Sequence, residues 1–339
     1  MNSRRLLLPL AAIYGAGQWL DRTRKSARRF RSVLPVISVG NLSVGGSGKT
    51  PLILHLVERL QPHYPLLVLS RGYGRADGSD RLWSPGHPAP DPAQFGDEPA
   101  LIARALRNGA LAVASNRSEF LKSLESQFQG HAVLLDDGFQ HYALARDLDI
   151  VIVDDRTVRH PFLIPAGDLR EPLSALRRAG IVLATSDSAA ELAHKWKAPG
   201  TPIFRMRQEV AEITEWLDTS RKYDGARVLA LSGIARPERF LGSLEQSGAD
   251  IAGTLSYADH HRYSMNDAAH IISELRQRGA EAIVTTSKDA IKLASLLELE
   301  IPLYVAHLRV IVECEEELLA ILHAKIAERI ANTRKQTRQ

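Results

Sequence analysis

The sequence predicts an α/β protein: a doubly wound, mostly parallel β-sheet followed by a second, smaller α/β domain. Short runs rich in leucine and β-branched residues alternate with longer helical stretches, which is the pattern of strands joined by crossover helices. The runs are almost continuously apolar, as expected of strands covered on both faces. With 339 residues, 45% of them hydrophobic, the chain is long enough for two domains with cores of their own.

The expected strands fall into two series. The first covers residues 35–40, 65–70, 111–115, 132–136, 149–154 and 180–185. The second, separated by helical runs such as 237–247 and 265–278, covers residues 226–234, 253–257, 281–287 and 302–312. Residues 201–218, between the two series, read as an extended connector. The predicted organisation is an N-terminal segment at 1–31, a first domain at 32–215, a smaller α/β domain at 216–332 and a polar tail at 333–339.

Positive charge is concentrated at the N-terminal end. Residues 1–31 hold eight arginines and lysines and one aspartate, a sum of +7, whereas the whole chain carries +4. The other 308 residues therefore sum to −3. A basic surface spread over the folded domains would favour nucleic-acid binding, so we expect no nucleic-acid partner and a local role for the first segment.

Within that segment, the uncharged residues 6–20 would form a helix roughly 22 Å long, short of the ~30 Å hydrocarbon core of a bilayer. Tyr14 and Trp19 lie in this apolar stretch, and arginines flank it on both sides. The pattern favours an amphipathic helix at an anionic membrane surface, and it leaves open whether the helix inserts into the bilayer or lies on it. A cleaved secretory signal and a packed N-terminal helix are the alternatives.

The chain contains one cysteine, Cys314. A single cysteine excludes an intramolecular disulfide and a cysteine-rich metal site, and it suits a reducing compartment. We therefore expect Cys314 to be a buried apolar side chain.

Residues 43–50, SVGGSGKT, predict a phosphate-binding loop, because they follow an expected strand and precede an expected helix. The match to G-x-x-x-x-G-K-[ST] fails only at the first position, where a serine can make the turn if its backbone is unstrained. Lys49 is expected to reach the β- and γ-phosphates, and the Thr50 hydroxyl to bind Mg²⁺. The predicted nucleotide-binding residues of this P-loop NTPase-like domain are Ser43, Val44, Gly45, Gly46, Ser47, Gly48, Lys49 and Thr50.

A P-loop usually works with an acidic residue at the end of a neighbouring strand, and two pairs qualify. Asp136 and Asp137 end one expected strand, and Asp154 and Asp155 end the next. Spacing alone does not choose between the pairs. The polar residues that follow the first pair favour it as the metal site, whereas the second pair also suits a strand end with a helix cap.

Three further stretches carry polar side chains suited to catalysis. Asp97 precedes a helical run, and on pattern alone it is predicted to be a helix cap. Asp259 stands beside His260 and His261, where an Asp–His pair for proton transfer is a more economical interpretation than a metal site. Arg170 stands in a loop that enters a helix, where a guanidinium would suit an anionic substrate group.

The motifs together resemble one family. In chain order they read GNLSVGGSGKTP, SRGYGR, GDEP, LLDDGFQH, DLREP, ADHHRY and TTSKDAIK. This set, preceded by the basic and apolar N-terminus, closely resembles the tetraacyldisaccharide 4'-kinases, the lipid A 4'-kinases of Gram-negative bacteria, from about residue 6 to residue 312. The P-loop of that family also tolerates a hydroxyl residue at its first position, which agrees with Ser43.

The resemblance implies transfer of the ATP γ-phosphate to the 4'-hydroxyl of tetraacyldisaccharide 1-phosphate, which gives lipid IVA at the cytoplasmic face of the bacterial inner membrane. The implied cofactors are ATP and Mg²⁺. The implied partners are the lipid substrate and the anionic membrane surface, with no obligate protein partner. The enzyme is expected to be a peripheral or monotopic membrane protein.

The resemblance also implies roles for individual residues. It favours Asp136 and Asp137, together with Thr50, as the Mg²⁺ ligands. It makes Asp97 the catalytic base rather than a cap, paired with a histidine for which His260 is preferred over His261. Because that histidine lies in the second domain, a closing motion is expected to complete the site. The implied substrate contacts are Arg71, Gln140, His141 and Arg170, and Lys49 is the implied catalytic lysine.

The alternative function is a membrane-attached P-loop NTPase that acts as a switch on a protein partner. A guanine-specific switch is disfavoured, because the chain has no N-K-x-D or T-K-x-D motif and residues 286–289, TSKD, place the lysine and aspartate next to each other. A switch would hydrolyse nucleotide without lipid, whereas the kinase would be nearly idle until its acceptor is added.

Overall fold

The structure, a computed structural model, describes residues 4–259, 261–294, 296–297 and 301–336. Within these residues twelve strands form one continuous β-sheet. The strands are β1 (Val36–Asn41), β2 (Leu66–Ser70), β3 (Arg81–Trp83), β4 (Gly109–Val113), β5 (Ala132–Asp136), β6 (Leu148–Val153), β7 (Ile181–Ala184), β8 (Ile203–Glu215), β9 (Val228–Ser232), β10 (Ile251–Ser256), β11 (Ala282–Thr286) and β12 (Leu303–Val312). The helical elements are η1 (Arg4–Leu7), α1 (Leu8–Ala27), α2 (Lys49–Leu60), α3 (Pro92–Phe95), α4 (Asp97–Ala105), α5 (Arg117–Leu124), α6 (Asp155–Arg159), η2 (Leu173–Arg178), α7 (Asp187–Trp196), α8 (Pro237–Gln246), α9 (Met265–Gln277), α10 (Ser287–Leu293) and α11 (Glu315–Gln336).

Strand pairing is mostly parallel, as predicted. The order across the sheet is β10-β9-β11-β12-β8-β7-β6-β1-β5-β2-β4-β3. Two pairs are antiparallel, the edge strand β3 with β4 and the long strands β8 and β12 with each other. Strand β1 lies between β5 and β6, so the loop that follows β1 emerges in the middle of the first part of the sheet.

Apolar side chains cover both faces of the first part of the sheet. In β1, Ile37 and Val39 belong to the core that also holds residues of α2 and α4, whereas Val36 belongs to the opposite core with residues of α5. Successive side chains of a strand point to opposite faces, so a strand with a core on each side is apolar throughout. This double coverage explains the continuous apolar runs of the sequence.

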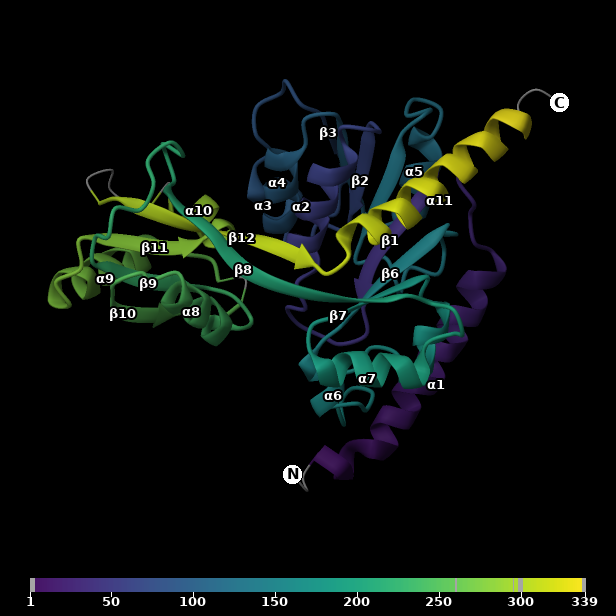
Figure 1. The fold of residues 1–339 in the computed structure, drawn as a ribbon, viewed down its shortest axis with the longest axis horizontal. Helices are drawn as coiled ribbons and strands as arrows, with labels where there is room; N and C mark the ends of the chain where they lie inside the picture. The colour runs from purple at the N-terminus through teal and green to yellow at the C-terminus, as the bar shows by residue number, and fades with distance from the viewer. Residues whose placement is uncertain (1–3, 260, 295, 298–300, 337–339) are drawn as a thin grey trace.

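Strand β8 joins two parts of the molecule. Its residues 203–205 pair in parallel with β7, and residues 206–215 pair antiparallel with β12. Figure 1 shows these two long strands running between the larger part, which contains β1 to β7, and the smaller part, which contains β9 to β11 and α8 to α10. The stretch expected to be an extended connector, residues 201–218, is therefore mostly a strand shared by both parts.

The C-terminal helix α11 returns to the larger part. Leu318, Leu322 and Ile326 are fully buried in the core that contains residues of β1 and α2. Residues 315–332 therefore pack away from the smaller part, with which the predicted boundaries of 216–332 grouped them. A helical period identifies the apolar face of a helix, but it does not identify the core that this face meets.

The two ends of α11 also differ from expectation. Of the expected polar tail at 333–339, residues 333–336 belong to α11 and residues 337–339 lie outside the described residues. The Thr333 hydroxyl donates a hydrogen bond to the Val33 carbonyl at 2.8 Å. Cys314, which was expected to be buried, is exposed. It lies in the turn before α11 with a φ of 54°, and its carbonyl accepts a hydrogen bond from the Glu317 amide. The tight turn places its side chain in solvent.

Candidate active site

The predicted phosphate-binding loop lies between β1 and α2. Gly45 and Gly48 have φ values of 89° and 92°, in the left-handed region that favours glycine. Gly48 is the N-cap residue of α2, so no side chain at that position caps the first amides of the helix. Uncapped amides at a helix N-terminus form an anion-binding position. The loop therefore has the geometry needed to hold phosphate groups.

Ser43, the residue that departs from the P-loop pattern, is buried and hydrogen bonded. Its hydroxyl donates to Asp154 Oδ1 at 3.3 Å, and its carbonyl accepts from Asn41 Nδ2 at 2.8 Å. Its φ is not positive, so this position does not require glycine. The side chain at the first position thus anchors the loop to Asp154, the residue that directly follows β6.

Lys49 and Thr50 open the helix that follows the loop. Lys49 Nζ donates to Asn41 Oδ1 at 3.2 Å and lies 3.6 Å from Asp137 Oδ1. The lysine therefore bridges the loop to the acidic end of β5. Thr50 lies in the first turn of α2, the position from which a hydroxyl can reach a phosphate-bound cation.

Asp136 ends β5 and is buried. Ser70 Oγ donates to its Oδ2 at 2.8 Å, while its Oδ1 has no hydrogen-bond partner among the described residues. Burial, together with the negative charges of Glu98 and Asp137, raises the pKa of Asp136 to about 6. A buried carboxylate oxygen without a donor is a position at which a hard cation would satisfy the site.

Asp137 is held by cations. Arg170 donates to both of its carboxylate oxygens, at 2.8 and 2.9 Å, and Lys49 lies close by. Burial alone would raise the pKa of Asp137, but the charges of Lys49 and Arg170 outweigh it and hold the pKa well below the usual range. Asp137 is thus an anion throughout the physiological range.

In the second acidic pair, Asp154 stabilises the fold through a helix cap and an ion pair. Asp154 Oδ1 accepts from the amide and the hydroxyl of Thr157, at 3.0 and 2.9 Å, and so caps α6. Its other oxygen accepts from Arg236 of the smaller part at 2.6 Å. The interpretation of Asp154 as a helix cap is therefore confirmed.

The four side chains predicted to contact the substrate differ in exposure, in their bonds within the protein and in charge. Arg71 follows β2 and is exposed. Gln140 donates to the Asn41 carbonyl and to Glu171, and Arg170 holds Asp137, so both side chains are engaged within the protein. Burial and the positive charges of Arg117 and other neighbours lower the pKa of His141 to about 3, so its imidazole is neutral at pH 7.

Asp97 is the first residue of α4, and the helix cap predicted from pattern alone is wrong. The N-cap residue is Gly96, and no side chain makes a cap hydrogen bond there. Instead, Asp97 Oδ2 lies 3.5 Å from Nζ of Lys292, which the smaller part supplies. The neighbouring Glu98 lies 3.6 Å from Lys288, which belongs to α10 like Lys292.

Of the two candidate histidines, the structure describes only His261. His260 lies outside the described residues. His261 stacks against Tyr257, with ring centroids 4.7 Å apart, and its Nε2 lies 3.3 Å from Asp267 Oδ2. The imidazole of His261 is thus placed against its own part of the molecule, beside the start of α9.

Several polar residues of the site were not selected from the sequence. Arg117 is buried, and its guanidinium donates to the carbonyls of Asp136 and Asp137, which fixes the turn after β5. Glu171 is buried in an ion pair with Arg178 at 2.8 Å. Arg117 follows the carboxyl end of β4, where parallel sheets gather polar groups, and Glu171 stands beside Arg170 in the DLREP motif.

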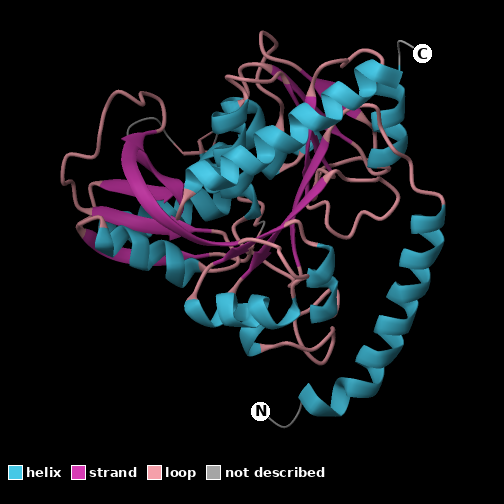
Figure 2. Ribbon diagram, turned by 45° about the vertical axis from the view of Figure 1, so that its right-hand side comes forward, coloured by secondary structure: helices cyan, strands magenta, loops and turns pink. Residues whose placement is uncertain are grey.

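An apolar groove lies beside α1. Its volume is about 390 Å³, and its walls come from Leu8, Ala11 and Ala12 of α1 and from a segment that includes Phe162 and Leu173. Figure 2 shows α1 running along one side of the molecule. Large side chains of the N-terminal segment are exposed, among them Leu6, Leu10, Ile13, Trp19 and Leu20. No helix within the described residues is both long and apolar enough to cross a bilayer.

Helix α1 is linked directly to the polar site. The Tyr14 hydroxyl and the Gln18 amide both donate to the carbonyl of Arg170. The side chain of Arg170 in turn holds Asp137. A single residue therefore contacts both the apolar helix and the acidic end of β5.

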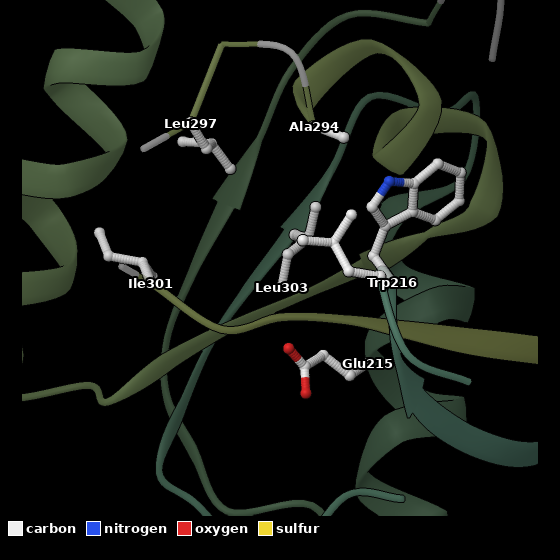
Figure 3. A pocket seen from close by; sticks show the side chains of 7 residues that line it. Glu215, Trp216, Ala294, Leu297, Ile301 and Leu303 are labelled. Atoms are coloured by element: carbon white, nitrogen blue, oxygen red, sulfur yellow. The ribbon is translucent and has the colours of Figure 1, made fainter. Parts of the chain in front are cut away.

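A second hollow lies in the smaller part. Figure 3 shows Leu297, Ala294, Leu303 and Trp216 around it. Its volume is about 40 Å³, roughly a tenth of what small-molecule sites require. It is therefore a packing gap rather than a candidate binding site.

Comparison with known proteins gives consistent matches. The family model described as "LpxK: Tetraacyldisaccharide-1-P 4'-kinase" matches residues 3–327. The tetraacyldisaccharide 4'-kinase of Anaeromyxobacter dehalogenans (strain 2CP-C) is 41% identical over 281 residues, 78% of this chain and 73% of that protein. The enzyme of the same name from Syntrophus aciditrophicus (strain SB) is 40% identical over 331 residues, 88% of this chain and 86% of that protein. The crystal structure of LpxK from Aquifex aeolicus in complex with ATP has a TM-score of 0.77 and 29% identity, covering 95% of this chain and 99% of that one.

Proposed function

The chain belongs to the tetraacyldisaccharide 4'-kinase family, and we propose that the site at the P-loop carries out the phosphoryl transfer. The protein is an ATP-dependent kinase of lipid A biosynthesis. The proposed reaction moves the γ-phosphate of ATP to the 4'-hydroxyl of tetraacyldisaccharide 1-phosphate and yields lipid IVA. The observation that carries the proposal is the meeting of the P-loop lysine with the Asp136–Asp137 pair at the carboxyl end of β5.

In the proposed donor half, backbone amides of residues 43–50 hold the phosphates of ATP, and Lys49 balances charge on the β- and γ-phosphates. Thr50, Asp136 and Asp137 would hold Mg²⁺, which neutralises phosphate charge when it is bound. The orphaned Oδ1 of Asp136 supports this choice of ligands. Among the described residues no three carboxylate, histidine or cysteine side chains gather around one point, so phosphate and water oxygens would complete the coordination.

In the proposed transfer step, Asp97 accepts the proton of the 4'-hydroxyl as that oxygen attacks the γ-phosphorus. The bond between the γ-phosphorus and the β–γ bridging oxygen breaks, and ADP leaves with the electron pair. His260 is proposed to orient Asp97. The contact between His261 and Asp267 supports this preference, because it directs the His261 ring to its own part of the molecule.

For the acceptor half, we propose that α1 lies on the anionic cytoplasmic face of the inner membrane. The exposed apolar side chains of its segment and the +7 charge of residues 1–31 support this orientation. The groove of about 390 Å³ beside α1 has the size and apolar lining to admit part of an acyl chain. Arg71, Gln140, His141 and Arg170 are proposed to surround the sugar or its 1-phosphate, with Gln140 and Arg170 acting mainly through the residues they position.

The proposed reaction is tested with γ-labelled ATP and tetraacyldisaccharide 1-phosphate in detergent micelles, and mass spectrometry locates the new phosphate. We expect label at the 4' position, and a decrease of at least about 10²-fold in the rate for Lys49→Ala, because the developing charge loses a fixed cation. Arg59→Ala, on the exposed side of the same helix, is the control and should retain activity. Nucleotide hydrolysis at full rate without lipid would instead support the switch.

A further inference from the structure

The segment TTSKDAIK, residues 285–292, has no part in the mechanism described above. It contains the end of β11 and most of α10. Lys288 and Lys292 lie four residues apart on α10 and therefore share one face of the helix. Both side chains are largely buried, at 14% and 12% exposure, although lysine is among the residues most rarely buried. This face of α10 meets the start of α4.

Lys292 bridges the two parts of the molecule at the proposed base. Its Nζ lies 3.5 Å from Asp97 Oδ2 in the larger part and 3.5 Å from Asp289 Oδ1 in its own helix. It also donates to the His261 carbonyl at 3.0 Å and lies over the Tyr263 ring. The ammonium group is therefore held on one side and directed at Asp97 on the other.

Asp289, which stands behind Lys292, is rigidly placed. It is fully buried, and its carboxylate accepts hydrogen bonds from the Gly233 amide at 2.9 Å, the Tyr263 hydroxyl at 3.1 Å and the Thr286 hydroxyl at 2.8 Å. Fully satisfied buried networks of this kind restrict the positions of the groups they contain. The position of Lys292 is thus set by a fixed anion rather than by solvent.

Helix α4 is contacted by the smaller part at both ends. At the first turn of α4, Glu98 lies 3.6 Å from Lys288 of the smaller part. The same lysine lies 3.3 Å from Asp259, which also belongs to the smaller part. At the last turn of α4, the Arg104 guanidinium lies 4.1 Å from the ring centroid of Trp216, the aromatic residue beside the apolar hollow in Figure 3. The orientation of Asp97 therefore depends on contact between the two parts.

A base at this position works in a strongly negative environment. Glu98 follows Asp97 in α4, the charges of Glu98 and Asp137 both act on the buried Asp136, and the phosphates of ATP would add further negative charge. We propose that Lys292 is a positioning residue for Asp97: it fixes the carboxylate toward the acceptor and offsets the surrounding negative charge, so that the smaller part supplies the cation that the proton transfer needs. This inference rests on the proposed function, in which Asp97 accepts the 4'-hydroxyl proton.

The test is a double-mutant cycle on the purified full chain, with ATP and the tetraacyldisaccharide lipid in micelles. We expect Lys292→Met to lower kcat about 10²-fold, with the KM for ATP changed less than about 3-fold, because the base is displaced while the P-loop is intact. Lys292→Arg keeps the charge and should restore at least about a tenth of the activity. In an Asp97→Asn background, Lys292→Met should lower the remaining rate less than about 3-fold, because residues that act as a unit are not additive.

Lys325→Met, on an exposed face of α11, is the matched control and should leave activity unchanged. A full 10²-fold loss for Lys292→Met in the Asp97→Asn background would overturn the proposal, as would equal kcat values for the arginine and methionine variants. If the methionine variant does not unfold cooperatively, Lys292→Gln replaces it in the same cycle. A kcat of the glutamine variant equal to that of Lys292→Arg would then contradict the proposal. Absence of lipid phosphorylation by the unmodified chain would instead contradict the proposed function.

Discussion

Asp137 has a backbone conformation that residues other than glycine seldom adopt. Its φ is 46°, in the left-handed region, and it lies directly after β5. Such a conformation persists only where surrounding contacts impose it, and here Arg117 holds the backbone carbonyl while Arg170 holds the carboxylate. The position of this carboxylate beside the P-loop is thus a product of two arginines that lie elsewhere in the sequence.

His141 predicts a pH dependence of stability. The pKa of His141 is about 3 in the folded chain and close to 6.5 in the unfolded chain. Its contribution to the free energy of unfolding is therefore fully present above pH 6.5 and is lost as the pH falls toward 3. The loss should reach about 3 kcal/mol at pH 4.5, which is two pH units at about 1.4 kcal/mol each. Urea unfolding at pH 7.5 and 4.5 measures it, and His141→Asn should remove most of this difference.

The matched control for that measurement is His87→Asn, which replaces an exposed histidine in a loop. Its unfolding should keep the pH dependence of the unmodified chain. A His141→Asn variant that loses as much stability on acidification as the unmodified chain would contradict the assignment of a neutral, half-buried imidazole.

At the scale of elements, α1 exposes large apolar side chains to solvent and also contacts a residue of the site, a combination that a packed surface helix seldom has. Only Ala11 of the helix is buried, and large apolar side chains face solvent along it. Tyr14 and Gln18 link the helix to Arg170 at the site through hydrogen bonds to its carbonyl. An exposed apolar surface rimmed by arginines is typical of an interfacial helix, which agrees with the proposed membrane association.

We expect the double variant Ile13→Ser and Trp19→Ser to bind anionic vesicles at least about 10-fold more weakly, because both side chains are largely exposed and each apolar group is worth roughly 1.5–3 kcal/mol when it enters an apolar phase. Cosedimentation with phosphatidylglycerol-containing vesicles measures the binding. Leu217→Ser, at an equally exposed leucine in the smaller part, should bind like the unmodified chain. Equal losses for both variants would contradict a role for α1.

Across the whole molecule, the two parts share one sheet and also meet through charges. Arg236, just before α8 of the smaller part, pairs with the fully buried Asp154 at 2.6 Å. Asp154 in turn accepts a hydrogen bond from Ser43 of the P-loop. The contact therefore connects the smaller part to the first residue of the nucleotide loop.

We expect Arg236→Met to lower the free energy of unfolding by about 3 kcal/mol, because it leaves a buried carboxylate without its cation. Arg239→Met is the control: this arginine lies 3.5 Å from Asp155 at an exposed position, and its loss should cost less than about 1 kcal/mol. Urea denaturation measures both values. Similar losses for the two variants would contradict a buried interdomain ion pair.

Local patterns were enough to locate most elements and the P-loop. The expected strands at 132–136 and 302–312 match β5 and β12 closely, and the helical run at 265–278 matches α9. These predictions depend on side-chain periodicity and on glycine spacing, which act over a few residues. These signals arise within the segment itself, so they can be recognised before its tertiary partners are known.

The motif pattern of the sequence by itself determined a parallel α/β fold, a phosphate-binding loop and the resemblance to a lipid kinase family. Only the tertiary structure decided that α11 packs on the larger part, that Cys314 is exposed, and that Lys292 stands against Asp97, 195 positions away in the chain. The physical reason is that burial and charge pairing depend on which distant surfaces meet. A periodic pattern states that a surface is apolar or charged, but its partner is chosen only when the whole chain folds.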